Sequence, residues 1–580
     1  MNASTLRKFL WAYLLLLVPL AWFVSKFDPY GIDGDAVAYM DIADLIHAGD
    51  WHAVVNGYWH PLYPVFLAVG QTVFHATRWN ELRAYYAVNV VIFLLEIASV
   101  VLLIHGLVRL RRRLAPGVTT LFSGDALCLL GLSLLLIATM RDMTLGKVRT
   151  DSLLQAFIFA GIGLLMEALA VEGSAAYVFS SLMGLTFGLA YLTKSFAFLL
   201  TLLSVLTLVV FAVLVCKRRL VPAATQGALA LICFSVIAGP YIAALSHQQG
   251  RFDFGDSGNL NYVWYVSGTE KFHLQPSMTS SFGSAKVELK HPEKELLQSP
   301  GVYSYTAMQN GTYPPWFSPT YWNDHITPKF NLHLLLKRDT RNVVLIVRYL
   351  LNHPESLVLL LVLLLTCATM RGTTRFAWPA GVIGVLIWAI YALVNVEERY
   401  VTAAFLLIML SLFASLKPSA RPYAPTVAAV VLLLFALLPL GAAIREAAEA
   451  RRQQSIAGNI PAWRDKQMFG AAQGLSALME PQGTIACIGT DACVHDHYWA
   501  RLAGVRIVAE IYAPRSNHLV ESLDSMANRN AVYSLLRSQG ATVLVGAFEP
   551  ESMNATHPGA EGWQRLGETR FYALRLTASH

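Results

Sequence analysis

Acidic residues in the first polar segment of the chain are the first candidates for chemistry. Asp33 and Asp35 lie in GIDGDAVAYM, which follows an apolar stretch. A positioned carboxylate can take a proton from a hydroxyl group and so act as a general base. We therefore interpret Asp35 as a candidate base. The simpler alternative is a helix N-cap, because an Asp at the start of a helix satisfies free backbone amides and meets the positive end of the helix dipole.

Three further groups of charged residues mark the ends of other apolar stretches. A cation at membrane depth costs about 2.5–3.5 kcal/mol unless it reaches the interface or a partner, so Lys194 alone could simply extend to the lipid headgroups. If the cations share one side of the membrane with Asp35, they could instead hold an anionic headgroup and stabilise a phosphate leaving group. The groups are Arg149 with Asp151 in VRTDSLL, Lys194 in GLAYLTKSF, and Glu397, Glu398 and Arg399 in NVEERYV.

The composition places these residues in a membrane protein. The chain is 55% hydrophobic and only 14% charged, and its mean hydropathy is +0.48, which a soluble core cannot accommodate. A helical crossing of the bilayer needs roughly 20 apolar residues. About eleven stretches meet this requirement, near residues 9–25, 85–108, 122–140, 152–171, 178–193, 195–216, 223–245, 354–370, 376–395, 400–416 and 424–443.

Clusters of Lys and Arg predict the orientation, because positive charge is retained in short cytoplasmic loops. Counting helices from a cytoplasmic N-terminus puts all of the clusters on the cytoplasmic side. This count treats the apolar stretch 61–77 as re-entrant or interfacial. It also takes the first helix as retained rather than cleaved as a signal peptide. The formal net charge of +7 then reflects topology and gives no case for nucleic-acid binding. The clusters are Arg7-Lys8, Arg109 with Arg111–Arg113, Lys217–Arg219, Arg371 with Arg375, and Lys417 with Arg421.

This topology predicts a bacterial-type inner-membrane protein in which the polar segments lie outside the cytoplasm. The segment 246–342 is rich in Tyr, Trp and Pro, and we interpret it as a folded cap over a site, with an interfacial aromatic belt as the alternative. The remaining external segments are 26–84, 141–151 and everything after about residue 445.

A short helix is expected to follow Asp35. Its apolar side can lie on the membrane interface while Asp41 and Asp44 face water, so these two acids are predicted to be solvated rather than catalytic. The apolar residues are Tyr39, Met40, Ile42, Ala43, Leu45 and Ile46.

The tail, residues 445–580, has the pattern of a periplasmic α/β domain. Four segments, TIACIG, RIVAEIY, TVLVGAF and RFYALRL, are predicted strands, and 462–479 and 519–539 are predicted helices. Cys487 and Cys493 lie in CIGTDAC within this tail. An oxidising compartment favours a disulfide between them.

The order of the motifs in residues 1–420 resembles the GT-C superfamily of integral-membrane glycosyltransferases. Within it, the chain is similar to the protein O-mannosyltransferase and aminoarabinose–lipid A transferase group, which is glycosyltransferase family 39-like. The resemblance implies a mainly α, polytopic fold, with residues 1–444 as the catalytic module. The segments that carry it are GDAVAYMDIADLIHAGDW followed by HPLYPVFLAVG, then VRTDSLL, GLAYLTKSFAFLL and ERYVTAAF.

The resemblance also implies a reaction and its residues. The donor would be a sugar linked to polyprenyl phosphate, and Asp35 would be the general base of a single inverting displacement. No cofactor is implied, and a divalent metal is neither required nor excluded. The donor phosphate would be held by Arg149, Lys194 and Arg399, and the supporting residues would be Asp33, Tyr39, His60, Tyr63, Asp151, Glu398 and Tyr400.

Three departures from the family pattern leave the sugar open. Ala36 follows Asp35 where a second acid is usual, His60 stands where Lys is common, and Ser195 replaces the usual Gly after Lys194. The acceptor, whether a lipid, a glycan or a protein, is open as well.

Two other classes of protein fit parts of the pattern. A carrier or flippase for a lipid-linked glycan would use Asp35, Lys194 and Arg399 to bind and release a headgroup without chemistry. Transporters often show internal repeats and binding sites at the bilayer midplane, whereas this sequence shows no repeat and places its charges at the outer face. A scaffold that only displays the tail would leave those charges unexplained. We therefore expect a glycosyltransferase.

Overall fold

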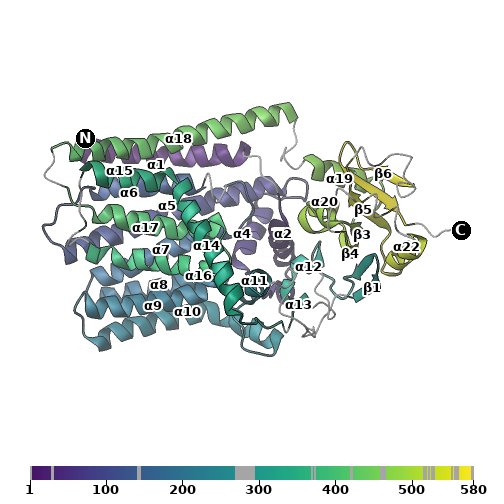
Figure 1. Ribbon diagram of the computed structural model, residues 1–580, viewed down its shortest axis with the longest axis horizontal. Helices are drawn as coiled ribbons and strands as arrows, with labels where there is room; N and C mark the ends of the chain where they lie inside the picture. The colour runs from purple at the N-terminus through teal and green to yellow at the C-terminus, as the bar shows by residue number, and fades with distance from the viewer. Residues whose placement is uncertain are drawn as a thin grey trace.

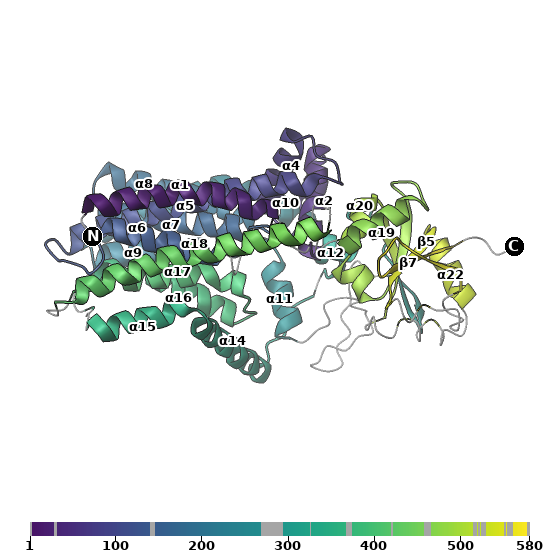
Figure 2. The same cartoon turned by 90° about the horizontal axis from the view of Figure 1, so that it is seen from above.

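The computed structural model describes two parts of the chain, a bundle of long helices and a smaller domain built around a β-sheet (Figure 1). Helices α2 (Gly34–His47) and α12 (Pro314–Phe317) lie between these two parts in both views (Figure 2). The described residues are 3–27, 32–139, 145–267, 294–324, 326–366, 374–418, 422–457, 466–513, 529–549 and 561–576, with the single residues 370, 519, 523 and 553.

All eleven predicted apolar stretches overlap helices of the bundle, and the chain is a multi-pass membrane protein. Among the described residues, eight helices are long and apolar enough to cross a membrane. They are α1 (Ala3–Phe27), α5 (Glu81–Leu114), α7 (Asp151–Ala170), α8 (Ser174–Thr193), α9 (Phe196–Leu214), α10 (Leu220–Gln249), α17 (Glu398–Ser415) and α18 (Ala424–Ala457).

Three of the predicted stretches form shorter helices. These are α6 (Gly124–Ala138), α15 (Pro354–Thr366) and α16 (Trp378–Ala392). The chain bends by 68° between α14 (Leu332–Asn352) and α15, and the two together are apolar enough for one crossing. The helix α14 begins inside the segment 246–342, which we had expected to lie wholly outside the membrane helices.

Glycines bring the helices that carry the candidate residues close together. A Cβ atom on Gly163 of α7 would lie 2.9 Å from the backbone nitrogen of Leu103 in α5. A Cβ atom on Gly184 of α8 would collide with the backbone oxygen of Ala230 in α10. Small residues at helix contacts are typical of membrane bundles, where close backbone approach supplies the packing energy. These contacts fix the ends of α7 and α8 relative to their neighbours.

The apolar side of α2 packs against other parts of the protein, and the expectation that Asp41 faces water is wrong. Met40 and Ile42 are fully buried and belong to one apolar cluster with residues of the C-terminal domain, such as Tyr498 and Leu502. Asp41 is buried as well. A second apolar surface, made by the tail and by segment 246–342, covers the side of α2 that we had assigned to lipid.

Asp35 is not the N-cap of α2, which was the simpler interpretation of this residue. The side chain of Asp33 accepts a hydrogen bond of 3.0 Å from the backbone nitrogen of Ala36, so Asp33 is the N-cap. Asp35 lies in the first turn of the helix. Its carboxylate is therefore free to have another role.

The C-terminal domain contains the four strands expected from the sequence, in a larger sheet. Strand order is β1-β2-β4-β3-β5-β7-β6, with β3 parallel to both β4 and β5 and the other pairs antiparallel. The strands are β1 (Lys294–Gln298), β2 (Gly301–Ser304), β3 (Thr484–Ile488), β4 (Arg506–Ile511), β5 (Val543–Ala547), β6 (Trp563–Arg565) and β7 (Phe571–Arg575), and the helices are α19 (Lys466–Ser476), α20 (Tyr498–Ala503) and α22 (Arg529–Ser538).

Strands β1 and β2 come from segment 246–342 and not from the tail. The pairing of β2 with β4 joins this segment to the C-terminal sheet. The boundary at residue 445 stays a prediction, because α18 continues to Ala457 and the sheet draws on both segments.

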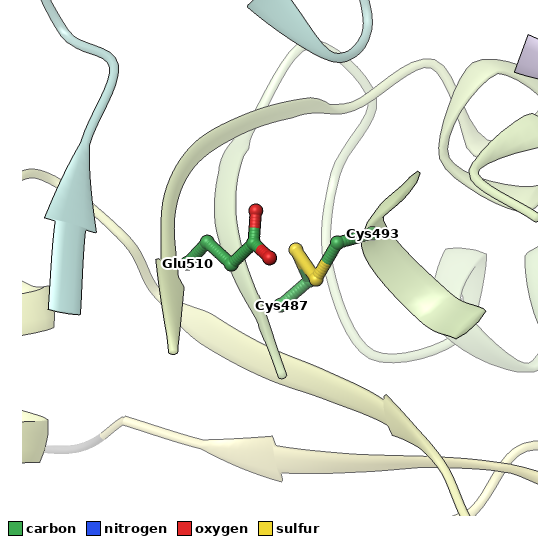
Figure 3. A group of neighbouring side chains, drawn as sticks. All are labelled: Cys487, Cys493 and Glu510. Carbon is green, nitrogen blue, oxygen red and sulfur yellow. A yellow bond between two sulfur atoms is a disulfide. The ribbon is translucent and has the colours of Figure 1, made fainter. Parts of the chain in front are cut away.

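The predicted disulfide is present. Cys487 at the end of β3 is bonded to Cys493, and their Cα atoms are 5.7 Å apart (Figure 3). The carboxylate of Glu510 in β4 lies beside the pair and accepts hydrogen bonds from the hydroxyl groups of Tyr305 (3.0 Å) and Tyr313 (2.7 Å). Glu510 thus ties the tail to segment 246–342, whereas the disulfide closes a loop within the tail.

Candidate active site

Charged residues from four distant parts of the sequence meet at one end of the bundle. The Arg399 guanidinium lies 3.2 Å from a carboxylate oxygen of Asp35 and 3.5 Å from one of Asp151. The Lys194 ammonium lies 3.0 Å from the other oxygen of Asp151. Glu397 completes the group, 2.7 Å from Nε of Arg399. The structure therefore brings together Asp35, Asp151, Lys194 and Arg399, as the sequence predicted.

Helix ends position these side chains. Asp151 is the first residue of α7, where the helix dipole favours a negative charge, and Lys194 is the C-cap of α8, where it favours a positive one. Arg399 lies in the first turn of α17. Because α7 starts and α8 ends at the same end of the bundle, residues that are far apart in sequence become neighbours.

Both oxygens of Asp35 are held by hydrogen bonds. The Arg399 guanidinium donates to Oδ2, and the indole nitrogen of Trp316 donates to Oδ1 at 3.2 Å. The Asp35 side chain keeps 22% of its surface exposed, so a substrate can still reach it. Sequence reasoning missed Trp316, whose only signal was its place in the aromatic run TYPPWFSP.

A cavity of about 590 Å³ joins the charged group to the outer surface of the bundle. Asp35, Asp151, Lys194 and Arg399 line its polar part. Its apolar part includes Phe198, Leu199 and Leu202 of α9. Leu199 and Leu202 are about two-fifths exposed, on a helix that is long and apolar enough to cross a membrane. An amphiphile with an anionic head and an apolar tail fits this arrangement.

Arg149 does not line this cavity. It forms an ion pair with Asp33 and lines a second cavity of about 500 Å³. Burial alone would raise the pKa of Asp33, but the charge and hydrogen bond of Arg149 and the amide of Ala36 outweigh it, so the pKa is lowered. The Asp33 carboxylate thus stays ionised as the cap of α2.

The second cavity is rich in cations and lies on the other side of Arg399. Lys147 and Arg348 line it together with Arg149. Glu397 and Arg399 belong to the walls of both cavities. Glu398, a predicted supporting residue, lines only this second one. Nothing in the sequence pattern had indicated Lys147 or Arg348.

The tyrosines expected to support the site lie in and beneath it. The Tyr400 hydroxyl accepts a hydrogen bond from Arg399 at 3.1 Å, and the Lys194 ammonium lies 4.2 Å from the centre of the Tyr400 ring. Tyr39 lines the first cavity and packs edge-to-face on Tyr63, which is fully buried beneath α2. Tyr400 therefore holds both cations, and Tyr63 supports the floor.

His60 does not act as a cation. It is buried against the rings of Tyr191 and Tyr241. Burial lowers the pKa of His60 to about 3, so its ring is neutral at physiological pH. His60 therefore packs against neighbouring aromatic rings and does not supply a charge.

A carboxyl pair that sequence reasoning missed lines the first cavity. Asp253 and Asp256 follow α10 in the segment RFDFGDSGN, and Arg251 forms two hydrogen bonds with Asp256, at 2.8 and 3.1 Å. Burial and the neighbouring charge of Asp253 raise the pKa of Asp256 to about 6. The Oγ atoms of Ser257 and Ser195 are 2.7 Å apart, which joins this segment to the residue after Lys194.

A set of close metal-donor groups lies away from the charged group, in the C-terminal domain. In the described part of the chain, the only set of three close donor groups is Cys487, Cys493 and Glu510 (Figure 3). The two cysteines are joined in a disulfide and offer no thiolate.

Comparison with known proteins shows a shared fold. No protein-family model and no curated protein matches the chain in sequence. Among solved structures, ArnT from Cupriavidus metallidurans bound to undecaprenyl phosphate is similar, with a TM-score of 0.55 and 13% identity over 100% of this chain and 99% of that one. The apo form of the same protein gives a TM-score of 0.50 and 14% identity over the same shares. The predicted resemblance to this group is confirmed as a resemblance of fold.

Proposed function

We propose that this protein transfers a sugar from a polyprenyl-phosphate-linked donor to an acceptor hydroxyl on the extracytoplasmic side of the membrane. The observation that carries the proposal is the first cavity. It combines a held carboxylate, Asp35, with two cations, Lys194 and Arg399, and its apolar wall reaches the lipid-facing surface of α9. The undecaprenyl phosphate in the ArnT structure, which has the same fold, supports a donor of this kind.

The proposed reaction is a single displacement with inversion. The Asp35 carboxylate takes the proton of the acceptor hydroxyl, and the acceptor oxygen bonds to the anomeric carbon. The bond from that carbon to the phosphate oxygen breaks, and its electron pair leaves with the polyprenyl phosphate. Lys194 and Arg399 stabilise the negative charge on this leaving group.

The cations can hold a phosphate without giving up their present partners. A Lys ammonium has three N–H donors and an Arg guanidinium has five. Lys194 uses one donor for Asp151. Arg399 uses four, for Asp35, Asp151, Glu397 and the Tyr400 hydroxyl, which leaves one N–H for a phosphate. Asp151 would thus hold the two cations side by side. Arg149, which faces the second cavity, would act mainly by fixing Asp33.

The lipid that co-purifies with the protein tests the donor class. A polyprenyl phosphate or its sugar ester is expected in lipid extracts of the purified protein, identified by mass spectrometry. The Lys194→Met variant should retain less of it. An extract that contains only bulk phospholipid in both proteins would count against the donor.

Donor binding is expected to depend on the charge of Asp256. Since its pKa is raised to about 6, this carboxyl is mostly neutral below that pH and negative above it. The added negative charge lines the cavity that would hold the donor phosphate, so affinity should fall as the pH rises from 5 to 7. Asp256→Asn should remove this pH dependence of donor affinity. The ligand should be the sugar phosphodiester, because a phosphomonoester itself ionises near pH 6. Equal pH profiles for the two proteins would contradict the prediction.

The proposed orientation can be tested by labelling introduced cysteines with an impermeant maleimide. Ser534 is exposed on α22, and Thr119 is exposed in the loop between α5 and α6. Ser534→Cys should be modified in cells whose outer membrane alone is permeabilised, and Thr119→Cys only after lysis. The opposite pattern would place the site in the cytoplasm.

A further inference from the structure

We propose that Arg501 of the C-terminal domain is a positioning residue for Asp35, because it fixes the helix α2 on which Asp35 lies. The catalytic meaning of this inference rests on the proposed function. Its structural part, the fixing of α2 by the tail, stands on the contacts alone.

Every N–H group of the Arg501 guanidinium has a carboxylate partner. Nε and Nη2 donate to the two oxygens of Glu81 in α5 at 3.0 and 2.7 Å. Nη1 donates to Asp41 at 2.7 Å, and Nη1 and Nη2 donate to the two oxygens of Asp44 at 2.9 and 3.0 Å. The side chain is 1% exposed. Five bonds in a fixed fork set both the distance and the angle between α20 and α2.

The carboxylates around Arg501 are held from other elements too. Asp41 accepts hydrogen bonds from the backbone nitrogen and the hydroxyl group of Thr312, at 2.6 and 2.9 Å. Gln71 of α4 (Leu62–Val73) donates to Asp44 at 2.8 Å. The backbone oxygen of Arg501 accepts from Arg78 at 3.1 Å. The network therefore joins α2 to the bundle, to segment 246–342 and to the tail.

The same parts of the chain also touch the other end of α2. A Cβ atom on Gly34 would lie 2.9 Å from the Trp316 ring and 3.1 Å from the ring of His497, so the helix start is packed tightly between them. Trp316 is the donor to Asp35. Asp41 follows Asp35 by six residues, about 9 Å along a helix axis. A shift of α2 at the Arg501 end would therefore be passed to Asp35.

A buried cluster of charges by itself contributes little to the stability of the folded protein. Taking charges out of water costs free energy that apolar side chains of similar volume do not incur. Three carboxylates around one buried arginine are better explained by the precise placement that the bonds impose. A displacement of about 1 Å at a catalytic group can cost about 10²-fold in rate.

Arg501→Lys in the full-length protein is the decisive variant, because it keeps the charge but loses the five-bond fork. We expect the turnover per donor-binding molecule to fall about 10²-fold with donor affinity unchanged. Hydrogen exchange of the α2 amides should become faster, and this readout does not depend on activity. Arg570→Lys is the matched control, since Arg570 pairs with Asp491 and Asp496 within the tail.

The outcomes separate the positioning role from general folding and from the proposed function. Wild-type turnover per donor-binding molecule, or unchanged exchange in α2, would overturn the inference. If Arg501→Lys does not accumulate, Arg501→Met combined with Asp41→Asn removes a carboxylate charge together with the cation, and the same two measurements apply. A wild-type protein that transfers no sugar would refute the proposed function, while the exchange of α2 would still decide whether Arg501 fixes this helix.

Discussion

Asp35→Asn is expected to slow sugar transfer by about 10²–10⁴-fold while donor binding is retained, since this is the usual contribution of a positioned general base. Asn has the shape of Asp and can still accept the hydrogen bond from Trp316, but it cannot take the acceptor proton. The helix should be unaffected, because Asp33 and not Asp35 caps α2. Initial rates and equilibrium binding of a polyprenyl-phosphate sugar, measured on the same purified samples, separate the two effects.

Asp50→Asn is the control for this experiment. Asp50 lies in the same external segment and caps the short helix α3 (Trp51–Val54) through the backbone nitrogen of Ala53. Because Asn caps a helix about as well as Asp, this variant should transfer sugar at the wild-type rate. Transfer by Asp35→Asn at a near-normal rate would rule out Asp35 as the base.

Lys194→Met is expected to weaken donor binding by about 10–150-fold, because a hydrogen bond to a charged group contributes about 1.5–3 kcal/mol. Met retains most of the apolar length of Lys but has no charge. The ammonium of Lys194 lines the first cavity and is held by Asp151 and the Tyr400 ring. Titration with a polyprenyl phosphate in nanodiscs measures the loss.

Removal of Lys194 also leaves the negative charge of the buried Asp151 carboxylate less neutralised. This effect needs its own control. The double variant Lys194→Met with Asp151→Asn removes both charges. If phosphate binding is lost in both variants, the ammonium itself binds the donor. If the double variant regains affinity, Lys194 serves only to neutralise Asp151. Lys8→Met, exposed in α1 at the opposite end of the bundle, should bind normally.

The membrane helices and the meeting of the charged residues were predictable from the sequence for a simple reason. Apolar stretches of this length form helices in lipid, and charges at their ends can lie only at one of the two membrane faces. Arg149, Lys194 and Arg399 were placed on one face by the distribution of basic clusters elsewhere. The disulfide was predictable because Cys487 and Cys493 are close in the chain.

Contacts between distant segments were not predictable from one sequence. The apolar side of α2 indicated that this side is buried but not what covers it. We therefore expected lipid at the place where Tyr498 and Leu502 of the C-terminal domain lie. Asp41 and Asp44 appeared solvated because their partner, Arg501, lies more than 450 residues away. Trp316 had no signal beyond its aromatic neighbours.

The central claim is that the cavity at the end of the bundle carries out transfer rather than transport. The most direct measurement supplies purified protein in liposomes with a polyprenyl-phosphate sugar of known anomeric configuration and with an extract of the source membrane as acceptor. The anomeric configuration of the product is determined by nuclear magnetic resonance. The account predicts a product with the anomeric configuration opposite to that of the donor, and its formation should be lost in Asp35→Asn. Movement of the donor across the bilayer with no new glycosidic bond would contradict it and identify a carrier.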